Sequence, residues 1–580
     1  MNVSKKLTAL LLCAALLLSL CGCLPDEEAG AAQAEPAQTA QDAPAPDEPS
    51  PETPAEAEPV ETLAGGGYFD PVARPDISFA DMDQSEITLD DFRPYAEALT
   101  TASASGSREA FHRACAEAQQ QLLAINTAGT LAELASDQNA ADQTLSDRAS
   151  RQTQAYYDAV DLYNQTLFEI SEGENSSVLS KEFEMWQIEY FKSYDAESSA
   201  QSLALATQES QLVRQYAALS SQGEMDYDAA ADIFLELVSV RAELASLSGA
   251  ANFSEYAYSA YYSRDYSPTD AQKLWKTAKE DFAPLLHKYA DEVTSTLQSV
   301  QADGALDLSE TAITDALCYG AARISPEVSD AAQYLLSHGL YDISDSDTKL
   351  STGYTSYLYS YNVPFIYNCP YGSHLDYADL FHEFGHWLAG YYHGSDALYG
   401  VIDYDLSELQ SQGMEVLFLQ YYDEFFGENA QLLRAETLLN LVYSVVTGAM
   451  YDEFQQKVYL EPDLTKDRLL ELFREVYESY GFESYDGCEY RWADIIHNFQ
   501  QPLYYISYAV SAIPALELYV RSIDSPNDAA DAYLRVASMS DEEFFLTDAL
   551  REAGLANSMK SPIGDVIALK LEQSGAFDIS

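Results

Sequence analysis

The chain has 580 residues, of which 30 are Lys or Arg and 94 are Asp or Glu, so its formal net charge is −64 at pH 7. A protein that binds a phosphate backbone needs a basic surface, and this charge balance therefore excludes nucleic acid as a natural partner. The length corresponds to several domain lengths, and 47% hydrophobic residues are enough to build a large core.

The first 23 residues have the pattern of a secretory signal. Lys5 and Lys6 precede an apolar run, residues 7–20, which is too short to favour a membrane-spanning helix. A small-residue cleavage site follows at residues 20–23, Leu-Cys-Gly-Cys, and the segment resembles a bacterial lipoprotein signal with Cys23 as the lipidated first residue. We expect an extracytoplasmic protein, anchored by lipid to the outer face of the bacterial cytoplasmic membrane. A plain secretory signal is the alternative.

Residues 24–66 are rich in Ala, Pro, Glu and Asp and have almost no large apolar side chains. Such a segment cannot bury enough surface to offset its ordering entropy, so we predict a disordered tether. Residues 67–340 then show long apolar-periodic stretches with few prolines, which predict an N-terminal helical region. Within residues 341–580, only residues 349–368 have the β-branched and aromatic near-alternation of strands, and they predict a hairpin.

Residues 376–393 contain the motif His382-Glu383-Phe384-Gly385-His386, an HExxH pattern on a predicted, largely buried helix. Residues four apart lie one turn above each other, so His382 and His386 can share one zinc ion. Glu383 follows the first ligand and is placed to act as the general base toward water. A pair of ordinary core histidines is the alternative, but burying these groups without a partner is costly.

A second predicted helix, which continues as the apolar run 414–426, supplies the remaining polar groups. Glu408, Ser411 and Glu415 occur at i, i+3 and i+7 and share one face. Glu408 is the expected third metal ligand. Glu415 is expected to orient a ligand histidine through its other ring nitrogen, unless it is a solvated surface charge.

The HEFGH motif, followed about two dozen residues later by E-x-x-S-x-x-x-E, resembles the thimet oligopeptidase and oligoendopeptidase F family of zinc peptidases. Residues 349–368 resemble the hairpin that precedes the family's zinc helix, and residues 497–508 resemble its downstream His-and-Tyr segment. The likeness covers roughly residues 230–530.

The resemblance implies a mainly α fold, with a large helical body whose two halves surround a deep substrate channel. It also implies a small β hairpin beside the zinc helix, whose edge strand pairs with the substrate backbone, and a catalytic region over residues 341–580. His497, Tyr508 and Tyr505 are the expected donors to the oxyanion. Since the chain has 43 tyrosines, aromatic core packing is the alternative for this segment.

These patterns predict a zinc metalloendopeptidase, with one Zn²⁺ per chain, that cleaves internal bonds of short unstructured oligopeptides. A metallocarboxypeptidase of similar helical fold and a non-catalytic peptide-binding lipoprotein are the alternatives. Four cysteines lie outside the signal, Cys115, Cys318, Cys369 and Cys488, and the sequence does not choose between disulfides and free thiols.

Overall fold

The computed structural model describes residues 62–70, 74–192, 196–220, 225–302, 306–395, 398, 401–461 and 463–579. The predicted signal with Cys23, and the predicted tether up to residue 61, lie outside the described residues. Among the helices of the described part, none has the length and apolarity needed to cross a membrane.

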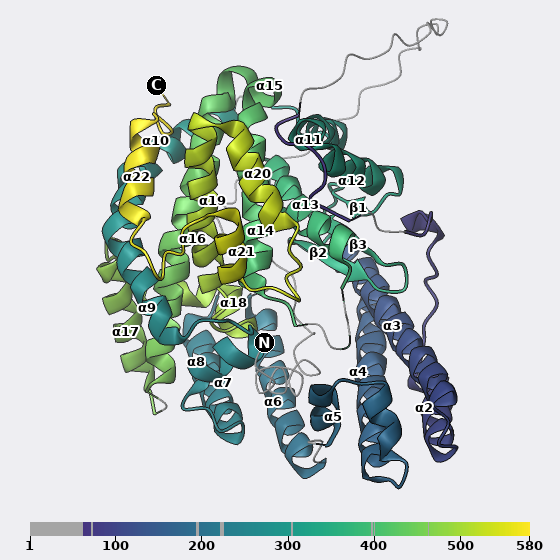
Figure 1. Ribbon diagram of the computed structural model, residues 1–580. Helices are drawn as coiled ribbons and strands as arrows, with labels where there is room; N and C mark the ends of the chain where they lie inside the picture. The colour runs from purple at the N-terminus through teal and green to yellow at the C-terminus, as the bar shows by residue number, and fades with distance from the viewer. Residues whose placement is uncertain are drawn as a thin grey trace, which may run out of the picture.

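The first described helices form a lobe with a hydrophobic core of its own, here called the N-terminal lobe (Figure 1). Phe92, Leu122 and Phe191 are buried in this core. Side-chain caps begin its two longest helices, where Ser107 accepts from the amide of Ala110 and Asp142 from that of Thr144. The lobe consists of α2 (Leu89–Ala104), α3 (Arg108–Gln138), α4 (Gln143–Glu172) and α5 (Met185–Lys192).

The rest of the described chain forms a main body around one continuous hydrophobic core. Its earlier helices are α6 (Ala196–Ser220), α7 (Tyr227–Leu247), α8 (Phe253–Tyr256), α9 (Pro268–Thr277), α10 (Ala283–Ala302), α11 (Glu310–Ile324) and α12 (Pro326–Ser337). Its later helices are α13 (Leu375–His393), α14 (Tyr404–Phe418), α15 (Tyr422–Phe426), α16 (Ala430–Tyr459), α17 (Lys466–Ser479), α18 (Ile496–Gln500), α19 (Ile506–Asp524), α20 (Pro526–Ala537), α21 (Leu546–Ala553) and α22 (Gly564–Gln573).

The predicted hairpin is present as part of a three-stranded sheet in the order β1-β3-β2. β1 (Tyr341–Asp342) is parallel to β3 (Val363–Asn368), and β2 (Gly353–Leu358) is antiparallel to β3. β2 is therefore an edge strand. α13 packs on the sheet, and α3 of the N-terminal lobe also contacts β2. The predicted mainly α fold with a small hairpin beside the HExxH helix is confirmed, whereas the deep channel stays a prediction.

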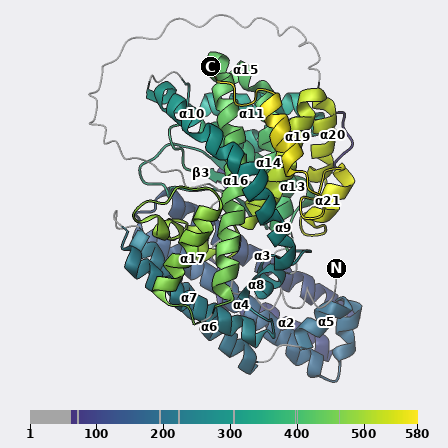
Figure 2. The same cartoon turned by 90° about the vertical axis from the view of Figure 1, so that its left-hand side faces the viewer.

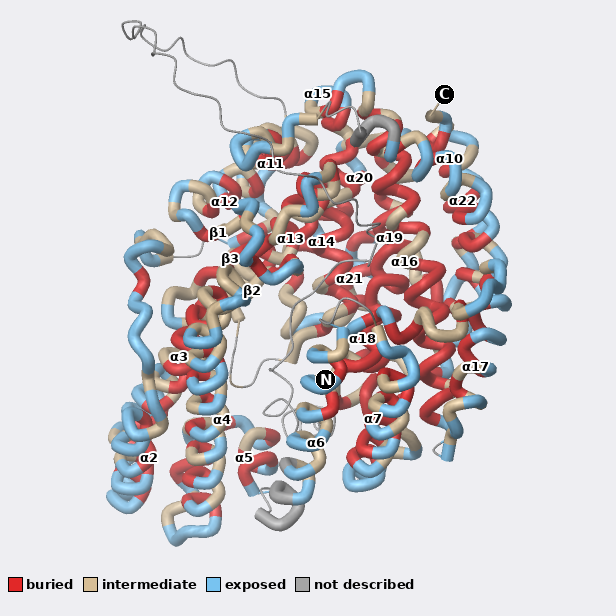
Figure 3. The backbone as a smooth tube through the Cα atoms, turned by 180° about the vertical axis from the view of Figure 1, so that it is seen from behind, coloured by how far each residue is buried: buried red, intermediate tan, exposed pale blue. Residues whose placement is uncertain are grey.

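The arrangement places α13 and α14 at the centre of the main body. Figure 2 shows α16 running the length of the main body, and α16 packs against α10, α17 and α19. Most residues of α14, α16 and α19 are buried (Figure 3). In the same view α3 and α4 of the N-terminal lobe extend below the sheet, and α6 and α7 lie below α18. The two helices that carry the predicted metal ligands thus lie in the interior of the main body.

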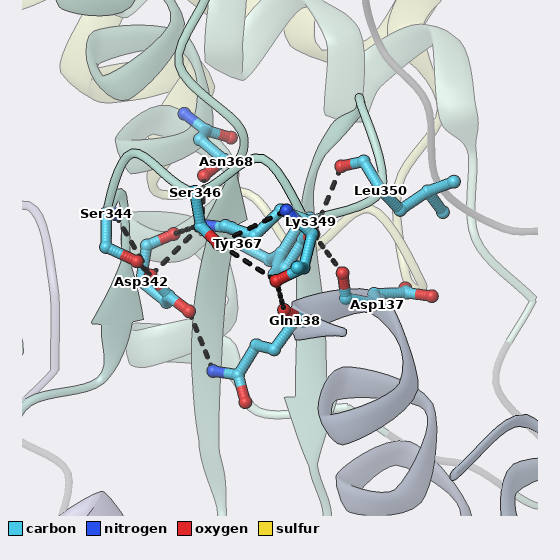
Figure 4. Close-up of polar contacts among 10 residues, drawn as sticks. Asp137, Gln138, Asp342, Ser344, Ser346, Lys349, Leu350, Tyr367 and Asn368 are labelled. Atoms are coloured by element: carbon cyan, nitrogen blue, oxygen red, sulfur yellow. Dashed lines mark hydrogen bonds and ion pairs between the residues drawn. The ribbon is translucent and has the colours of Figure 1, made fainter. Parts of the chain in front are cut away.

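The buried ammonium group of Lys349 links the C-terminal ends of β1 and β3 (Figure 4). Its Nζ donates to the backbone oxygen of Asn368 at 2.6 Å and to Oδ1 of Asp342 at 3.0 Å, and it lies 4.5 Å from the ring centroid of Tyr367. The C-terminal end of α3 joins the same cluster, because the backbone oxygen of Asp137 accepts from the amide of Leu350 and from the Tyr367 hydroxyl. Lys349 therefore braces the hairpin where the lobe meets the main body.

Lys349→Met should lower the free energy of unfolding by about 3 kcal/mol, because it removes one partner of a largely buried charge pair. Urea unfolding followed by tryptophan fluorescence measures this loss. The matched control is Lys273→Met, since Lys273 pairs with Asp270 while 58% of its side chain is exposed, and its loss should stay below about 1 kcal/mol. Equal losses in both variants would show that the buried position of Lys349 adds nothing.

Candidate active site

The HExxH residues lie in the buried middle of α13, which crosses α14 at very short range. A Cβ atom added to Gly385 would lie 2.5 Å from Cα of Ser411 and 2.6 Å from the backbone oxygen of Gln410. Both contacts are with backbone, so a larger residue at this position would push the two helices apart. The glycine inside the motif thus allows α14 to deliver Glu408 to the two histidines.

His382, His386 and Glu408 each present a ligand atom, and these atoms lie within 4.8 Å of one another. Nε2 of His382 is 3.7 Å from Oε2 of Glu408. The Nε2 atoms of both histidines are buried and have no hydrogen-bond partner among the described residues. Two imidazole nitrogens and a carboxylate facing one point form a donor set that suits a zinc ion. The structure therefore brings the three predicted ligands together into a group that could hold a metal.

The other ring nitrogen of each histidine has a partner on α14. Nδ1 of His382 lies 2.6 Å from Oε1 of Glu415, and Nδ1 of His386 lies 3.0 Å from Oγ of Ser407. These contacts fix the orientations of both rings. The Nε2 atom of each ring is left to face the group formed with Glu408. Glu415 thus lies where the sequence predicts an orienting carboxylate, while the contact with Ser407 was not predicted.

The electrostatics of the two histidines differ. Burial disfavours the charged form of both rings, and for His386 this effect, with the nearby charge of His382, holds the pKa well below its usual value. For His382 the hydrogen bond and charge of Glu415, together with Glu408 and Glu383, outweigh burial and raise the pKa to about 10. The surroundings of His382 are therefore strongly negative and favour a cation.

Glu383 is almost fully buried, and its carboxylate accepts a hydrogen bond from a residue of the sheet. Thr355 on β2 donates from Oγ1 to Oε2 of Glu383 at 2.7 Å. Burial raises the pKa of Glu383 to about 7, against the opposing effects of His382 and of the Thr355 hydrogen bond. A carboxyl group with a pKa near neutrality is suited to accept and release a proton. The sequence predicts the hairpin but not Thr355, because no pattern tells which strand residue meets the glutamate.

The predicted His-and-Tyr segment forms one aromatic cluster beside the ligands. The Tyr508 hydroxyl lies 3.4 Å from Nε2 of His497, and the ring of Tyr505 is 5.1 Å from that of His497. Tyr504 is the tyrosine that contacts a candidate ligand: its hydroxyl donates to Oε1 of Glu408 at 2.6 Å. Tyr504 was absent from the predicted site residues. Its neighbours in sequence are all aromatic or apolar, and only the approach of α19 to α14 distinguishes it.

Two buried arginines from the N-terminal half support this segment. Arg241 on α7 donates to the backbone oxygens of Asn498 and Phe499 on α18. Arg264 donates to Oγ of Ser507 at 2.9 Å and pairs with Asp405 in the first turn of α14. The first helical half of the chain thereby fixes the position of both α18 and α19 relative to α14.

The four cysteines outside the signal are all free thiols in the structure. Cys115 and Cys488 are buried, and Cys318 and Cys369 are partly exposed.

Residues 323–536 match the model of peptidase family M3. This region of the chain belongs to peptidase family M3. The match spans the hairpin, α13, α14 and the segment 497–508, so it covers every residue of the candidate site and supports a peptidase. A search of curated proteins finds no match.

Solved structures show the same fold over most of the chain. One assigned as an oligoendopeptidase F aligns with a TM-score of 0.69 at 18% identity and covers 86% of this chain and 98% of its own. PZ peptidase A with an inhibitor aligns at 0.67 and 19% identity, with the same coverage. A third, assigned as an oligoendopeptidase F from Bacillus anthracis strain Ames, aligns at 0.65 and 18% identity, again over 86% and 98%. The fold shared with these structures therefore extends well beyond the region that the family model matches.

Tyr504→Phe should weaken binding of zinc, used as the probe ion, by about 10- to 100-fold, because it removes a hydrogen bond that orients a ligand carboxylate. Competition with a chromophoric chelator measures the change. Tyr505→Phe is the control, since its ring packs on His497 and Tyr451, and its zinc affinity should stay within about threefold of the parent. Equal affinities in the Tyr504→Phe variant and the parent would show that this hydrogen bond does not support the ligand.

Proposed function

We propose that the chain is a zinc-dependent endopeptidase that hydrolyses internal bonds of short unstructured oligopeptides outside the cytoplasmic membrane. The observation that carries the proposal is the meeting of His382, His386 and Glu408 in a buried group, with Glu383 on the same helix as the two histidines. Membership of family M3 gives independent support for peptide hydrolysis.

The site divides the chemistry among its residues. When bound at His382, His386 and Glu408, zinc supplies a Lewis acid that lowers the pKa of a water and polarises the scissile carbonyl. Glu383 accepts a proton from the attacking water on its carboxylate. It then passes this proton to the leaving amine, and the products are two shorter peptides.

The aromatic cluster supplies donors for the carbonyl oxygen, which gains negative charge in the transition state. His497 and Tyr508 are in contact with each other and lie beside Tyr504, which touches Glu408. We assign the donor role to Tyr508 and His497, with Tyr505 as the next candidate. Tyr504 is committed to the ligand, so we give it a supporting role instead.

An extended peptide fits this site through its main chain. β2 is an edge strand, and its residue Thr355 touches Glu383. A substrate strand added to this edge would gain backbone hydrogen bonds without requiring a particular sequence. A folded domain has most of its backbone groups hydrogen-bonded internally, which is why we propose unstructured oligopeptides as substrates.

Digestion of a peptide blocked at its C-terminus is the experiment that tests the proposal. We expect cleavage at internal bonds, identified by mass spectrometry, at a rate similar to that of the unblocked peptide. Cleavage of only the unblocked peptide, one residue at a time from its C-terminus, would instead indicate a metallocarboxypeptidase. Binding without cleavage of either peptide would indicate a peptide-binding lipoprotein.

Glu383→Gln should keep zinc but lose nearly all turnover, because the ligands are untouched while the base becomes a neutral amide. Metal analysis and peptide cleavage are measured on the same preparation. If the variant keeps more than about a tenth of the parental kcat, Glu383 is not the general base.

Tyr508→Phe should lower kcat by about 100-fold with a smaller change in KM, because a hydrogen bond to the oxyanion forms fully only in the transition state. Steady-state kinetics with a fluorogenic peptide resolve the two constants. If Tyr508→Phe keeps a near-normal kcat while Tyr505→Phe loses activity, the donor is Tyr505. If both variants stay active, the cluster is aromatic core.

The location of the enzyme rests on the N-terminal pattern alone. We propose that acyl chains on Cys23 hold the mature protein at the outer face of the cytoplasmic membrane, since two or more chains give stable anchoring. Mass spectrometry of the mature N-terminus should find a lipidated Cys23, and Cys23→Ser should release the protein from membranes. A mature chain that begins elsewhere, or that lacks lipid, contradicts this localisation.

A further inference from the structure

We propose that Thr355 is a positioning residue that sets the orientation of the general base Glu383. This inference rests on the proposed peptidase function of the site. It adds that β2, the strand we expect to pair with the substrate backbone, also holds the catalytic carboxylate in place.

Thr355 makes two hydrogen-bond contacts with Glu383. Its Oγ1 is 2.7 Å from Oε2 of Glu383 and 3.1 Å from the backbone oxygen of the same residue. A hydroxyl has one proton to donate, and the shorter contact with the carboxylate is the stronger hydrogen bond. One contact is with the backbone of α13 and the other with the carboxylate, so Thr355 touches both the helix and the side chain of Glu383.

Thr355 is itself held rigidly. It pairs with Ile366 in the antiparallel register of β2 and β3, and every residue of β3 is buried. Trp387, one turn beyond Glu383 on α13, donates from its indole nitrogen to the backbone oxygen of Pro364 in β3 at 2.9 Å. A β-branched side chain also has few χ1 rotamers. The hydroxyl is therefore a fixed point, whereas the glutamate side chain has three rotatable bonds.

The consequence is a division of labour between the two carboxylate oxygens. Oε2 accepts from Thr355, so we assign to Oε1 the task of taking the proton from water. Without the hydroxyl, Glu383 would sample other rotamers and spend less time in the reactive one. Such a loss of orientation affects the chemical step and leaves substrate affinity unchanged.

Thr355→Val replaces the hydroxyl with a methyl group of similar size, and Thr355→Ser keeps the hydroxyl. We expect the Val variant to lose about 10- to 100-fold in kcat, with KM within about twofold and full zinc content. The Ser variant should recover most of the parental kcat. Thr314→Val is the control, because the hydroxyl of Thr314 donates to the backbone oxygen of Glu310 within α11, and its kcat should match the parent.

A second measurement separates orientation from substrate contact. In the Glu383→Gln background, which should bind peptide without cleaving it, adding Thr355→Val should leave the Kd of a fluorescent oligopeptide unchanged by anisotropy. A weaker Kd, or a higher KM with unchanged kcat, would make Thr355 a substrate contact and overturn the inference.

Loss of kcat in both the Val and Ser variants, with zinc retained, would also overturn it, because keeping the hydroxyl would then not preserve the rate. If the Val variant does not fold, a Ser variant with parental kcat and a Thr355→Ala variant with reduced kcat still support the inference, and equal rates contradict it. These outcomes differ from failure of the proposed function, in which the parental enzyme cleaves no peptide or Glu383→Gln remains active.

Discussion

The close crossing of α13 and α14 at Gly385 is the constraint on which the candidate site depends. A Cβ atom at position 385 would collide with two backbone atoms of α14, so this close approach requires glycine. The consequence is that Glu408 reaches His382 and His386, and that Glu415 and Ser407 reach the outer nitrogens of the same rings. One helix pair thus provides the expected ligands, the groups that orient them, and the proposed base beside them.

The crossing also creates an electrostatic cost that the surrounding structure must offset. Glu383 and Glu408 are nearly fully buried, and the pKa of Glu383 is raised because burial disfavours its charged form. Each carboxylate has a donor from another element: Thr355 on β2 for Glu383, and Tyr504, just before α19, for Glu408. The buried arginines Arg241 and Arg264 hold α18 and α19, the two helices that flank Tyr504 in the chain. A cation between the expected ligands would further offset the cost of burying these carboxylates. The packing of the helical body and the proposed chemistry thus depend on the same groups.

The sequence predicts those parts of the site that depend on local spacing. The four-residue separation of His382 and His386, and the shared face of Glu408 and Glu415, follow from helical periodicity, and the hairpin follows from strand alternation. Thr355, Ser407 and Tyr504 depend instead on how the elements pack: which face of β2 meets α13, and how closely α19 approaches α14. One sequence does not contain that information in a local pattern. The same limit explains why the sequence indicates the segment 497–508 but does not distinguish Tyr504 from Tyr505.

Zinc-edge X-ray absorption on the purified protein tests the central claim most directly, because it reports the ligands without relying on activity. The account predicts one zinc per chain with only nitrogen and oxygen neighbours at about 2.0–2.2 Å, and outer-shell scattering from two imidazoles. Glu408→Ala should change this shell or lose the metal. A sulfur neighbour at about 2.3 Å, a shell with fewer than two imidazoles, or an unchanged spectrum in the Glu408→Ala variant would contradict it.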